Sequence, residues 1–193
     1  MRSILDNFRS HFAVASASPV VMRDAAEWYP LARLHAHAVA LVGGWSLESA
    51  ASVLAAFSPR TRWTTNLRHA AEYASGGTPR CLRSNLRMAD AAVRDGFAAV
   101  RGPKVGPFAR AIAGDSEAVV QDSWMVFAAA NGADSEAVAT SRRTGKMPVK
   151  AKAPGVRMRR EMDAAIRLIA AETGLAPTTV QAAVWIAVRG RGD

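Results

Sequence analysis

Residues 101–112 read Arg-Gly-Pro-Lys-Val-Gly-Pro-Phe-Ala-Arg-Ala-Ile, and this stretch decides how the chain is interpreted. One helix is expected to end at Val100 and the next to start near Pro107, which predicts a tight hairpin between two helices. Gly102 and Gly106 can take backbone conformations that other residues avoid, and they let a second backbone come close. The first N–H groups of the second helix then point into the turn, where an anion such as a DNA phosphate is favoured.

The same residues are also typical of an ordinary corner between helices, in which Gly and Pro only end one helix and begin the next. Lys104 lies at the rim of the turn and would bring a positive charge to a bound phosphate. The hairpin alone leaves both interpretations open.

Outward from the hairpin, the chain is rich in alanine and shows no run of alternating apolar and polar residues. Alanine, leucine, arginine and glutamate favour helices, so we expect an all-α fold. Ser46 is a candidate N-cap, and the Ser58-Pro59 pair should end the helix that follows it. Most of 132–155 is expected to be loop. The helices are expected over residues 3–14, 23–42, 47–57, 61–74, 86–100, 107–112, 122–130, 157–173 and 177–188.

Three segments are expected from this pattern. Residues 1–140 would form one helical domain that carries the hairpin at 100–112. Residues 141–156 would form a basic linker or loop. Residues 157–193 would form a pair of helices packed on the same body, the second of which has Pro177 in its first turn.

The positive charge is unevenly distributed. The 193 residues include 25 Lys and Arg against 16 Asp and Glu, a formal net charge of +9. Residues 1–140 contribute a net +2 and residues 141–193 a net +7. Arg142, Arg143 and Lys146 open this basic stretch, which suits the phosphate backbone of a nucleic acid. Acidic lipids or proteins would attract it as well, and a solvated linker is the alternative.

Composition also argues against several classes of site. Cys81 is the single cysteine, which excludes an intramolecular disulfide, a cysteine-ligated zinc site and a four-cysteine iron–sulfur cluster. His35 and His37 fall on different faces of a helix and make a poor metal pair. We therefore expect no cofactor and no metal.

No apolar run reaches the length of a membrane span. The expectation is a soluble cytoplasmic protein, at the nucleoid or in a phage-infected host cell, with a monomer favoured.

An aspartate follows the hairpin within Val119-Val120-Gln121-Asp122-Ser123-Trp124-Met125, and Asp122 lies 16 positions beyond Gly106. A glycine-containing hairpin followed at this distance by an aspartate resembles the helix-hairpin-helix DNA glycosylase superfamily. The likeness covers roughly residues 47–140. The tail Gln-Ala-Ala-Val-Trp-Ile-Ala-Val-Arg at 181–189 is similar to small phage proteins.

The resemblance implies roles for particular residues. Asp122 would be the catalytic carboxylate that stabilises an oxocarbenium-like sugar while a base is removed hydrolytically. Arg60 would fill the space that a flipped base leaves in the duplex. The lysine of strand-cleaving members is absent, because Pro107 and Phe108 stand at that place, so a glycosylase would be monofunctional. Residues expected at the DNA backbone are Gly102, Lys104, Val105, Gly106 and Arg110, and those expected at the base pocket are Trp63, Asn66 and Trp124.

The same residues also allow other interpretations. An Asp before Ser-Trp-Met is also the pattern of a helix N-cap, which would give Asp122 a structural role. Most tryptophans in a small helical protein are core residues. The functional alternatives are a phage-type transferase that modifies a flipped, hypermodified pyrimidine, and a helix-hairpin-helix protein that binds DNA without catalysis.

Overall fold

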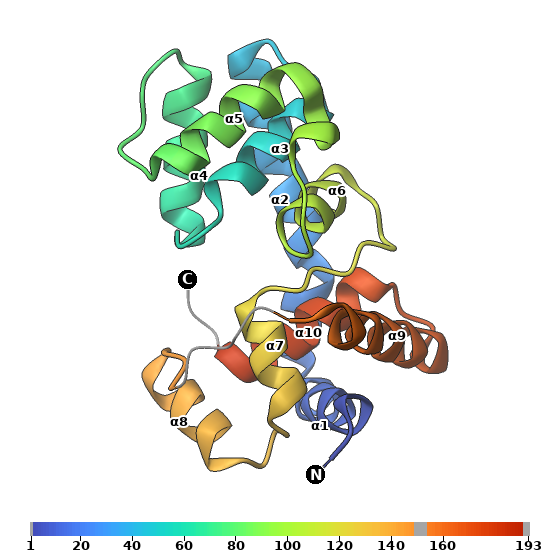
Figure 1. Cartoon of the computed structure of the whole chain (residues 1–193). Coiled ribbons are helices and arrows are strands. Elements are labelled where there is room, and N and C mark those ends of the chain that lie inside the picture. The colour runs from blue at the N-terminus through green and yellow to red at the C-terminus, as the bar shows by residue number, and fades with distance from the viewer. Residues whose placement is uncertain (1, 149–153, 191–193) are drawn as a thin grey trace. The chain divides into compact units, whose positions relative to one another are not determined.

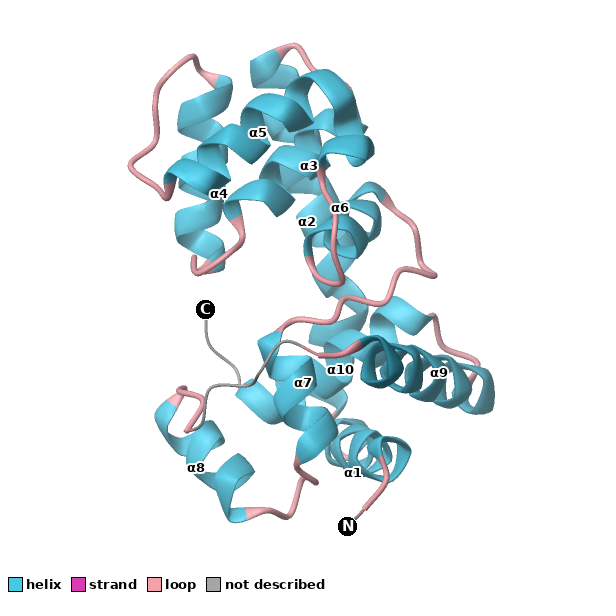
Figure 2. Ribbon diagram, viewed as in Figure 1, coloured by secondary structure: helices cyan, strands magenta, loops and turns pink. Residues whose placement is uncertain are grey.

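The computed structural model of this chain describes residues 2–148 and 154–190. Every regular element within these ranges is a helix (Figures 1 and 2), so the predicted all-α fold class is confirmed. The chain forms two compact units. We call residues 29–118 the central unit. The terminal unit consists of residues 2–28 and 119–190, apart from 149–153.

The central unit is built around α3 (Leu47–Phe57), whose bounds match the prediction. The hydroxyl of Ser46 accepts a hydrogen bond from the Ser49 N–H group at 3.0 Å and caps the start of the helix. Every residue from Ser49 to Phe57 is buried, because other helices surround α3 on all sides. Those neighbours are α4 (Trp63–Ala74), α5 (Arg83–Asp95), the 3₁₀ turn η1 (Gly96–Ala99) and α6 (Val105–Ala113).

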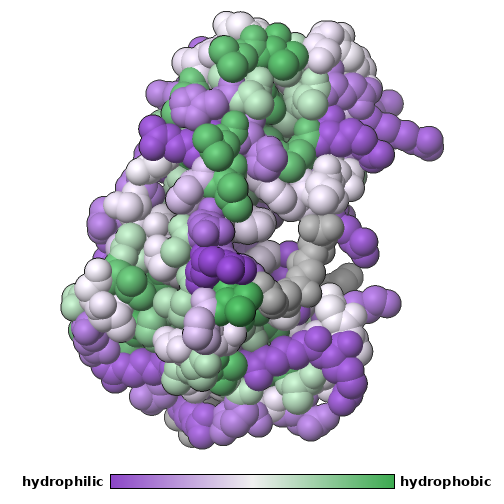
Figure 3. Space-filling model, turned by 180° about the vertical axis from the view of Figure 1, so that it is seen from behind, coloured by the Kyte–Doolittle hydropathy of each residue, from purple (hydrophilic) through white to green (hydrophobic). Residues whose placement is uncertain are grey.

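Helix α2 (Pro19–Gly43) begins in the terminal unit and ends in the central unit. Tyr29 is buried where α2 enters the central unit. Beyond it, the buried side chains of α2 are small and recur at helical spacing: Ala32, Ala36, Val39 and Ala40. The large apolar side chains of this part are exposed instead: Leu31, Leu34, Leu41 and Val42. Figure 3 shows apolar residues exposed among hydrophilic ones on one face of the molecule. Small residues therefore make the buried face of α2, which allows its backbone to approach neighbouring helices closely.

No single helix in the described ranges is long and apolar enough to cross a membrane. Helices α2 and α3 meet that test only when taken together, and they are bent by 109° relative to each other.

The terminal unit is built around α10 (Pro177–Arg189), which is almost entirely buried. Pro177 stands in its first turn, where the missing N–H group would have no helical partner. Phe8, Met125, Met162 and Ile166 are among the large side chains of the core that α10 completes. The surrounding helices are α1 (Ile4–Ser16), α7 (Ser123–Ala130), α8 (Glu136–Thr144) and α9 (Val156–Thr173).

Polar side chains of α1 bind the backbone at the end of α7. The Asn7 Nδ2 atom donates to the carbonyl of Ala129 at 2.9 Å. The His11 Nε2 atom lies 2.7 Å from the carbonyl oxygen of Asn131. The carbonyls at a helix end have no partner within the helix, so these side chains close α7 and fix α1 against it.

The loop predicted over 132–155 is wrong in its first part, because α8 occupies Glu136–Thr144. The Ser141 hydroxyl donates to the carbonyl of Val188 at 2.9 Å, and the Arg142 Nε atom donates to that of Ala187 at 2.6 Å. Helix α8 therefore caps the carboxyl end of α10, and this tertiary role is not visible in the local sequence. The part of the expected basic linker over residues 149–153 lies outside the described residues.

The compact units follow other boundaries than the expected segments 1–140, 141–156 and 157–193. Residues 29–118 form a unit of their own within the first segment. Helices α9 and α10 of the last segment pack against α1, at the opposite end of the sequence. The two ends of the sequence therefore form one unit, because the last helices pack against α1. No local sequence signal predicts this long-range packing. Residues 191–193 lie outside the described residues.

We expect acid to destabilise the terminal unit through His11. Burial lowers the pKa of His11 below its ordinary value of 6.5, although the hydrogen bond to Asn131 opposes this shift. The unfolded chain then binds a proton more readily than the folded chain, so stability is fully present above pH 6.5 and is lost as the pH falls below it. The free energy of unfolding should fall by at most about 1.4 kcal/mol per pH unit in that window.

Urea unfolding followed by circular dichroism at a series of pH values measures this effect. His11→Gln keeps an N–H donor for Asn131 and should flatten the pH dependence, while His37→Gln, at an exposed position, should leave it unchanged. Identical pH profiles for the two variants would contradict the assignment to His11.

Candidate nucleic-acid interface

The segment predicted as a hairpin between two helices lies in the central unit, where it joins the 3₁₀ turn η1 to α6. We keep the name hairpin for this segment. Helix α5 ends at Asp95 instead of continuing to Val100. Gly96 has a φ of 53°, and a Cβ atom there would lie 2.2 Å from Glu48 Oε1, so the chain leaves the helix at this glycine. The same Glu48 oxygen accepts a hydrogen bond from the Phe97 N–H group at 2.9 Å and holds η1 in place.

Helix α6 begins at Val105, two residues earlier than predicted, and Pro107 is its third residue. Proline is tolerated there because the first N–H groups of a helix have no helical partner. Gly102 is exposed and has a φ of 89°, as a tight turn requires. A Cβ atom on Gly106 would lie 3.0 Å from the carbonyl oxygen of Val100, so the close approach that this glycine allows is to its own chain.

The hairpin is joined to the turn that follows α3. The Lys104 Nζ atom donates to the carbonyl of Ser58 at 3.2 Å. The Asn85 Nδ2 atom donates to the next carbonyl, that of Pro59, at 3.1 Å. The Thr61 hydroxyl also donates to Pro59, at 3.2 Å. Side chains of the hairpin, of α5 and of the turn itself therefore fix this turn. The hairpin expected at the DNA backbone thus lies next to Arg60.

Arg60 is the only non-glycine residue with positive φ in the described part of the chain, at 60°. Its side chain is exposed. The left-handed conformation costs about 1–2 kcal/mol for a residue with a Cβ atom. Such strain persists only where the surroundings enforce it, and it is concentrated at functional sites. The hydrogen bonds to Ser58 and Pro59 enforce it here, which favours a functional role for Arg60.

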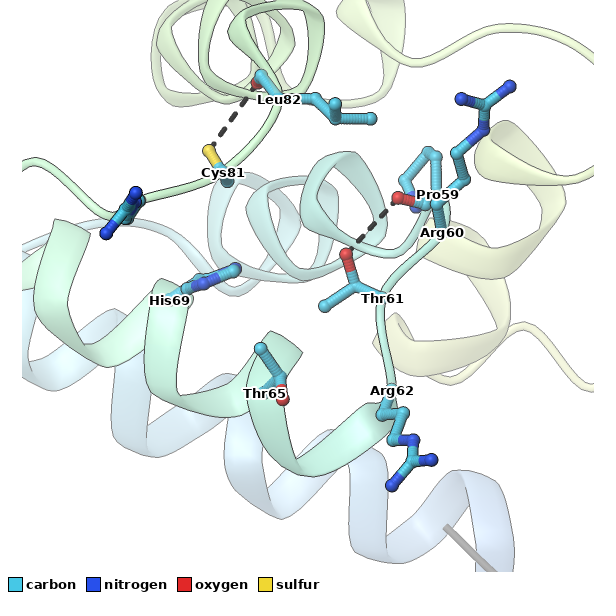
Figure 4. A pocket seen from close by; sticks show the side chains of 9 residues that line it. Pro59, Arg60, Thr61, Arg62, Thr65, His69, Cys81 and Leu82 are labelled. Atoms are coloured by element: carbon cyan, nitrogen blue, oxygen red, sulfur yellow. Dashed lines mark hydrogen bonds between the residues drawn. The ribbon is translucent and has the colours of Figure 1, made fainter.

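Arg60 also lines a hollow of about 430 Å³ that lies wholly within the central unit (Figure 4). Among the described residues, three arginines and no carboxylate contribute to its wall, which makes this wall electropositive. Figure 4 shows Thr65 and His69 rising from α4 toward the segment that carries Cys81 and Leu82. The lining residues are Pro59, Arg60, Thr61, Arg62, Thr65, His69, Arg80, Cys81 and Leu82.

The residues predicted for a base pocket do not line this hollow. Asn66 is buried, and its Nδ2 atom donates to the carbonyl of Leu54 at 3.0 Å, so it fixes α4 to α3. Trp63 makes edge-to-face contacts with His35 and Phe108, with ring centroids 6.1 Å apart in each pair. Both side chains therefore hold helices of the central unit together.

Asp122 belongs to the terminal unit, and its N-cap interpretation is confirmed. Its Oδ1 atom accepts a hydrogen bond from the Met125 N–H group at 2.9 Å and caps α7. Its Oδ2 atom accepts one from the indole Nε1–H group of Trp185 at 3.0 Å. Trp124, also predicted for the base pocket, packs edge-to-face on Phe127 beside the core. Each carboxylate oxygen thus has a structural partner, whereas the hairpin belongs to the other unit.

The other basic residues predicted at DNA divide into two kinds. Arg110, Arg143 and Lys146 are exposed. Arg142 is half-buried and binds the carbonyls of Ala187 and Ala133, and burial lowers the pKa of its guanidinium from the ordinary value. We therefore assign Arg142 a structural role at the end of α10. Val105, predicted at the DNA backbone, is instead buried and packs within the central unit.

Sequence reasoning did not associate Arg62, Arg80, His69 and Cys81 with one site. Arg80 precedes α5 in a glycine-rich loop, and only the folding of that loop brings it to the start of α4. Burial, together with the negative charge of Glu72, raises the pKa of the Cys81 thiol. The thiol is therefore protonated at neutral pH and is a poor nucleophile. No group of His, Cys, Asp or Glu suited to a metal ion occurs among the described residues.

The position of Asp122 predicts a stability effect for Asp122→Asn. Asparagine retains one oxygen, so one of the two N–H donors, on Met125 or Trp185, loses its acceptor and faces an NH₂ group. We expect the free energy of unfolding to fall by about 1–3 kcal/mol, the effect of leaving a donor unpaired. Urea unfolding measures the loss.

Asp95→Asn is the matched control, because Asp95 is exposed and caps no helix through its side chain. Its effect should stay within about 0.5 kcal/mol. In a double-mutant cycle, Trp185→Phe should couple to Asp122→Asn by about 0.5–3 kcal/mol. Additive effects would show that the 3.0 Å contact contributes nothing.

Comparison with known proteins places the chain in a family. No curated protein matches it, and no solved structure matches it. The model of one protein family, however, matches residues 1–192, which is nearly the whole sequence of 193 residues. A match of this length includes both compact units. The chain therefore belongs to that family, which is described as a family of unknown function, DUF7178.

Proposed function

We propose that this protein binds the sugar–phosphate backbone of DNA through the hairpin of the central unit and the neighbouring Arg60 turn. The observation that carries the proposal is the hydrogen bond from Lys104 to Ser58, which joins the two. This bond connects the exposed turn at Gly102 to the turn that holds Arg60 in a strained conformation. Backbone contacts of this kind position a protein on DNA without reading its sequence.

The net charge of this part of the chain also favours binding to DNA. Residues 59–110 contain ten Lys and Arg against three Asp and Glu, a net charge of +7, although the chain as a whole carries +9. Arg60, Arg101 and Arg110 are exposed. Cations that neutralise phosphates release the counterions condensed on DNA, and this release supplies most of the affinity in non-specific binding. The central unit therefore has the electrostatics that a DNA-backbone partner requires.

The proposed function is DNA binding and does not include catalysis. Removal of a base, which the resemblance to glycosylases implies, needs a carboxylate that is available to the sugar. Both oxygens of Asp122 are engaged with Met125 and Trp185, and this arrangement supports a helix cap. Among the functions considered from the sequence, DNA binding without catalysis is the one that the local geometry supports best.

Fluorescence anisotropy with a short labelled duplex tests the proposal. The logarithm of the binding constant should fall linearly with the logarithm of the salt concentration, with a slope of about −0.9 for each phosphate neutralised. Arg60→Gln keeps the length of the side chain and removes its charge. It should weaken binding to all sequences alike and make the slope shallower by about 0.9.

Arg157→Gln is the matched control, since Arg157 is an exposed arginine of α9 in the terminal unit. It changes the net charge by the same amount and should leave the affinity nearly unchanged. A salt-independent affinity, or an equal loss in both variants, would overturn the proposed interface. Alkali-labile sites in the bound DNA, lost in Asp122→Asn, would instead support base removal.

A further inference from the structure

We propose that the hollow between the Arg60 turn, α4 and the 80–82 segment binds the phosphate monoester of a nucleotide. This ligand class extends beyond the backbone contacts of the proposed function, because a monoester occurs only at the end of a strand or on a free nucleotide. The site therefore does not require that duplex DNA be bound elsewhere on the central unit.

The size of the hollow fits such a ligand. Its volume of about 430 Å³ falls within the range of roughly 300–1,000 Å³ that is usual for small-molecule sites. Phosphate alone would leave most of this space empty, whereas a nucleotide would occupy it. Pro59 and Leu82 supply apolar wall for the nucleoside, and Thr61 and Thr65 supply hydroxyl groups.

The charge of the hollow fits a monoester better than a backbone diester. Arg60 and Arg62 come from the turn between α3 and α4, and Arg80 comes from the loop before α5. No carboxylate of the described residues lines the wall. None of the three forms an ion pair within residues 2–148 and 154–190. A phosphate monoester carries a charge of about −1.5 to −2 at neutral pH and offers three oxygens, while a diester carries a single charge. Guanidinium groups bind such oxygens with paired hydrogen bonds.

The arginine side chains can close on a ligand. Figure 4 shows the guanidinium groups of Arg60 and Arg62 extending outward from the rim of the hollow. Both side chains are exposed, and exposed side chains change rotamer within nanoseconds. Bound phosphate would therefore draw them over the opening, while the fixed turn keeps the Arg60 backbone in place.

His69 forms part of the wall, and its ring meets the ring of Phe57 edge-to-face at 5.9 Å. The residue is 7% exposed, and its buried Nδ1 atom has no hydrogen-bond partner among the described residues. Buried polar atoms are nearly always paired in folded proteins. A rotation of the ring that brings this nitrogen to the hollow would let a group of the nucleotide pair with it.

Isothermal titration calorimetry of the full chain with adenosine 5′-monophosphate and with adenosine tests the site. The monophosphate should bind at least about tenfold more tightly, the effect of one charge-assisted hydrogen bond. The double variant Arg62→Ala/Arg80→Ala should remove this preference. Both substitutions are at exposed positions, so circular dichroism should show an unchanged fold.

Arg68→Ala is the matched control, because Arg68 is an exposed arginine of α4 that does not line the hollow. Oligonucleotides with a 5′-phosphate or a 5′-hydroxyl distinguish the source of the monoester. A phosphate preference seen only with the oligonucleotide supports a strand end, and one seen with the mononucleotide supports a free nucleotide. The proposal is overturned if neither probe shows a preference, or if the double variant behaves like Arg68→Ala. Arg62→Ala/Arg80→Ala separates the two sites, because Arg60 belongs to both: it should lose the phosphate preference and keep most of the affinity for duplex DNA.

Discussion

The central unit depends on the carbonyl groups that α3 leaves unpaired where it ends. A helix terminates with several carbonyls that lack a helical partner, and buried carbonyls must be paired elsewhere. Lys104 and Asn85 provide partners at Ser58 and Pro59, from the hairpin and from α5. These two bonds fix α3, α5 and α6 at one place and hold Arg60 in a conformation that it would otherwise avoid. The proposed interface and the proposed ligand site both begin at this turn.

In the terminal unit, too, the carbonyls at the ends of buried helices are paired by side chains, but by different residues. Helix α10 is buried on all sides, as α3 is, and its last carbonyls are bound by Ser141 and Arg142 of α8. The end of α7 is bound by Asn7 from α1. A helix whose side chains are apolar on every face can be buried at the centre of a unit. Its ends then lie inside the protein as well. Polar side chains from distant segments are the means by which such ends are paired.

Features that depend on neighbouring residues in the sequence were predicted correctly. Ser46 and the Ser58-Pro59 pair gave the bounds of α3, because a cap and a breaker act within a few residues. Helix α8 was missed because its sequence is poor in large apolar residues, and its stability comes from contacts with α10. The turn at 101–106 and the N-cap role of Asp122 were both among the predictions, but their distant contacts were not predicted. Glu48 binds the Phe97 N–H group just after α5, and Trp185 binds Asp122 from 63 positions away. The grouping of Arg60, Arg62 and Arg80 likewise depends on tertiary folding.

The conformation of Arg60 has a consequence for protein engineering. Glycine adopts positive φ freely, so a search for thermostable variants would select it at this position. The same replacement would delete the guanidinium group that both proposed sites use. Selection for heat resistance and selection for ligand affinity should therefore favour different residues at position 60, and a library sorted by each criterion separately would diverge there first.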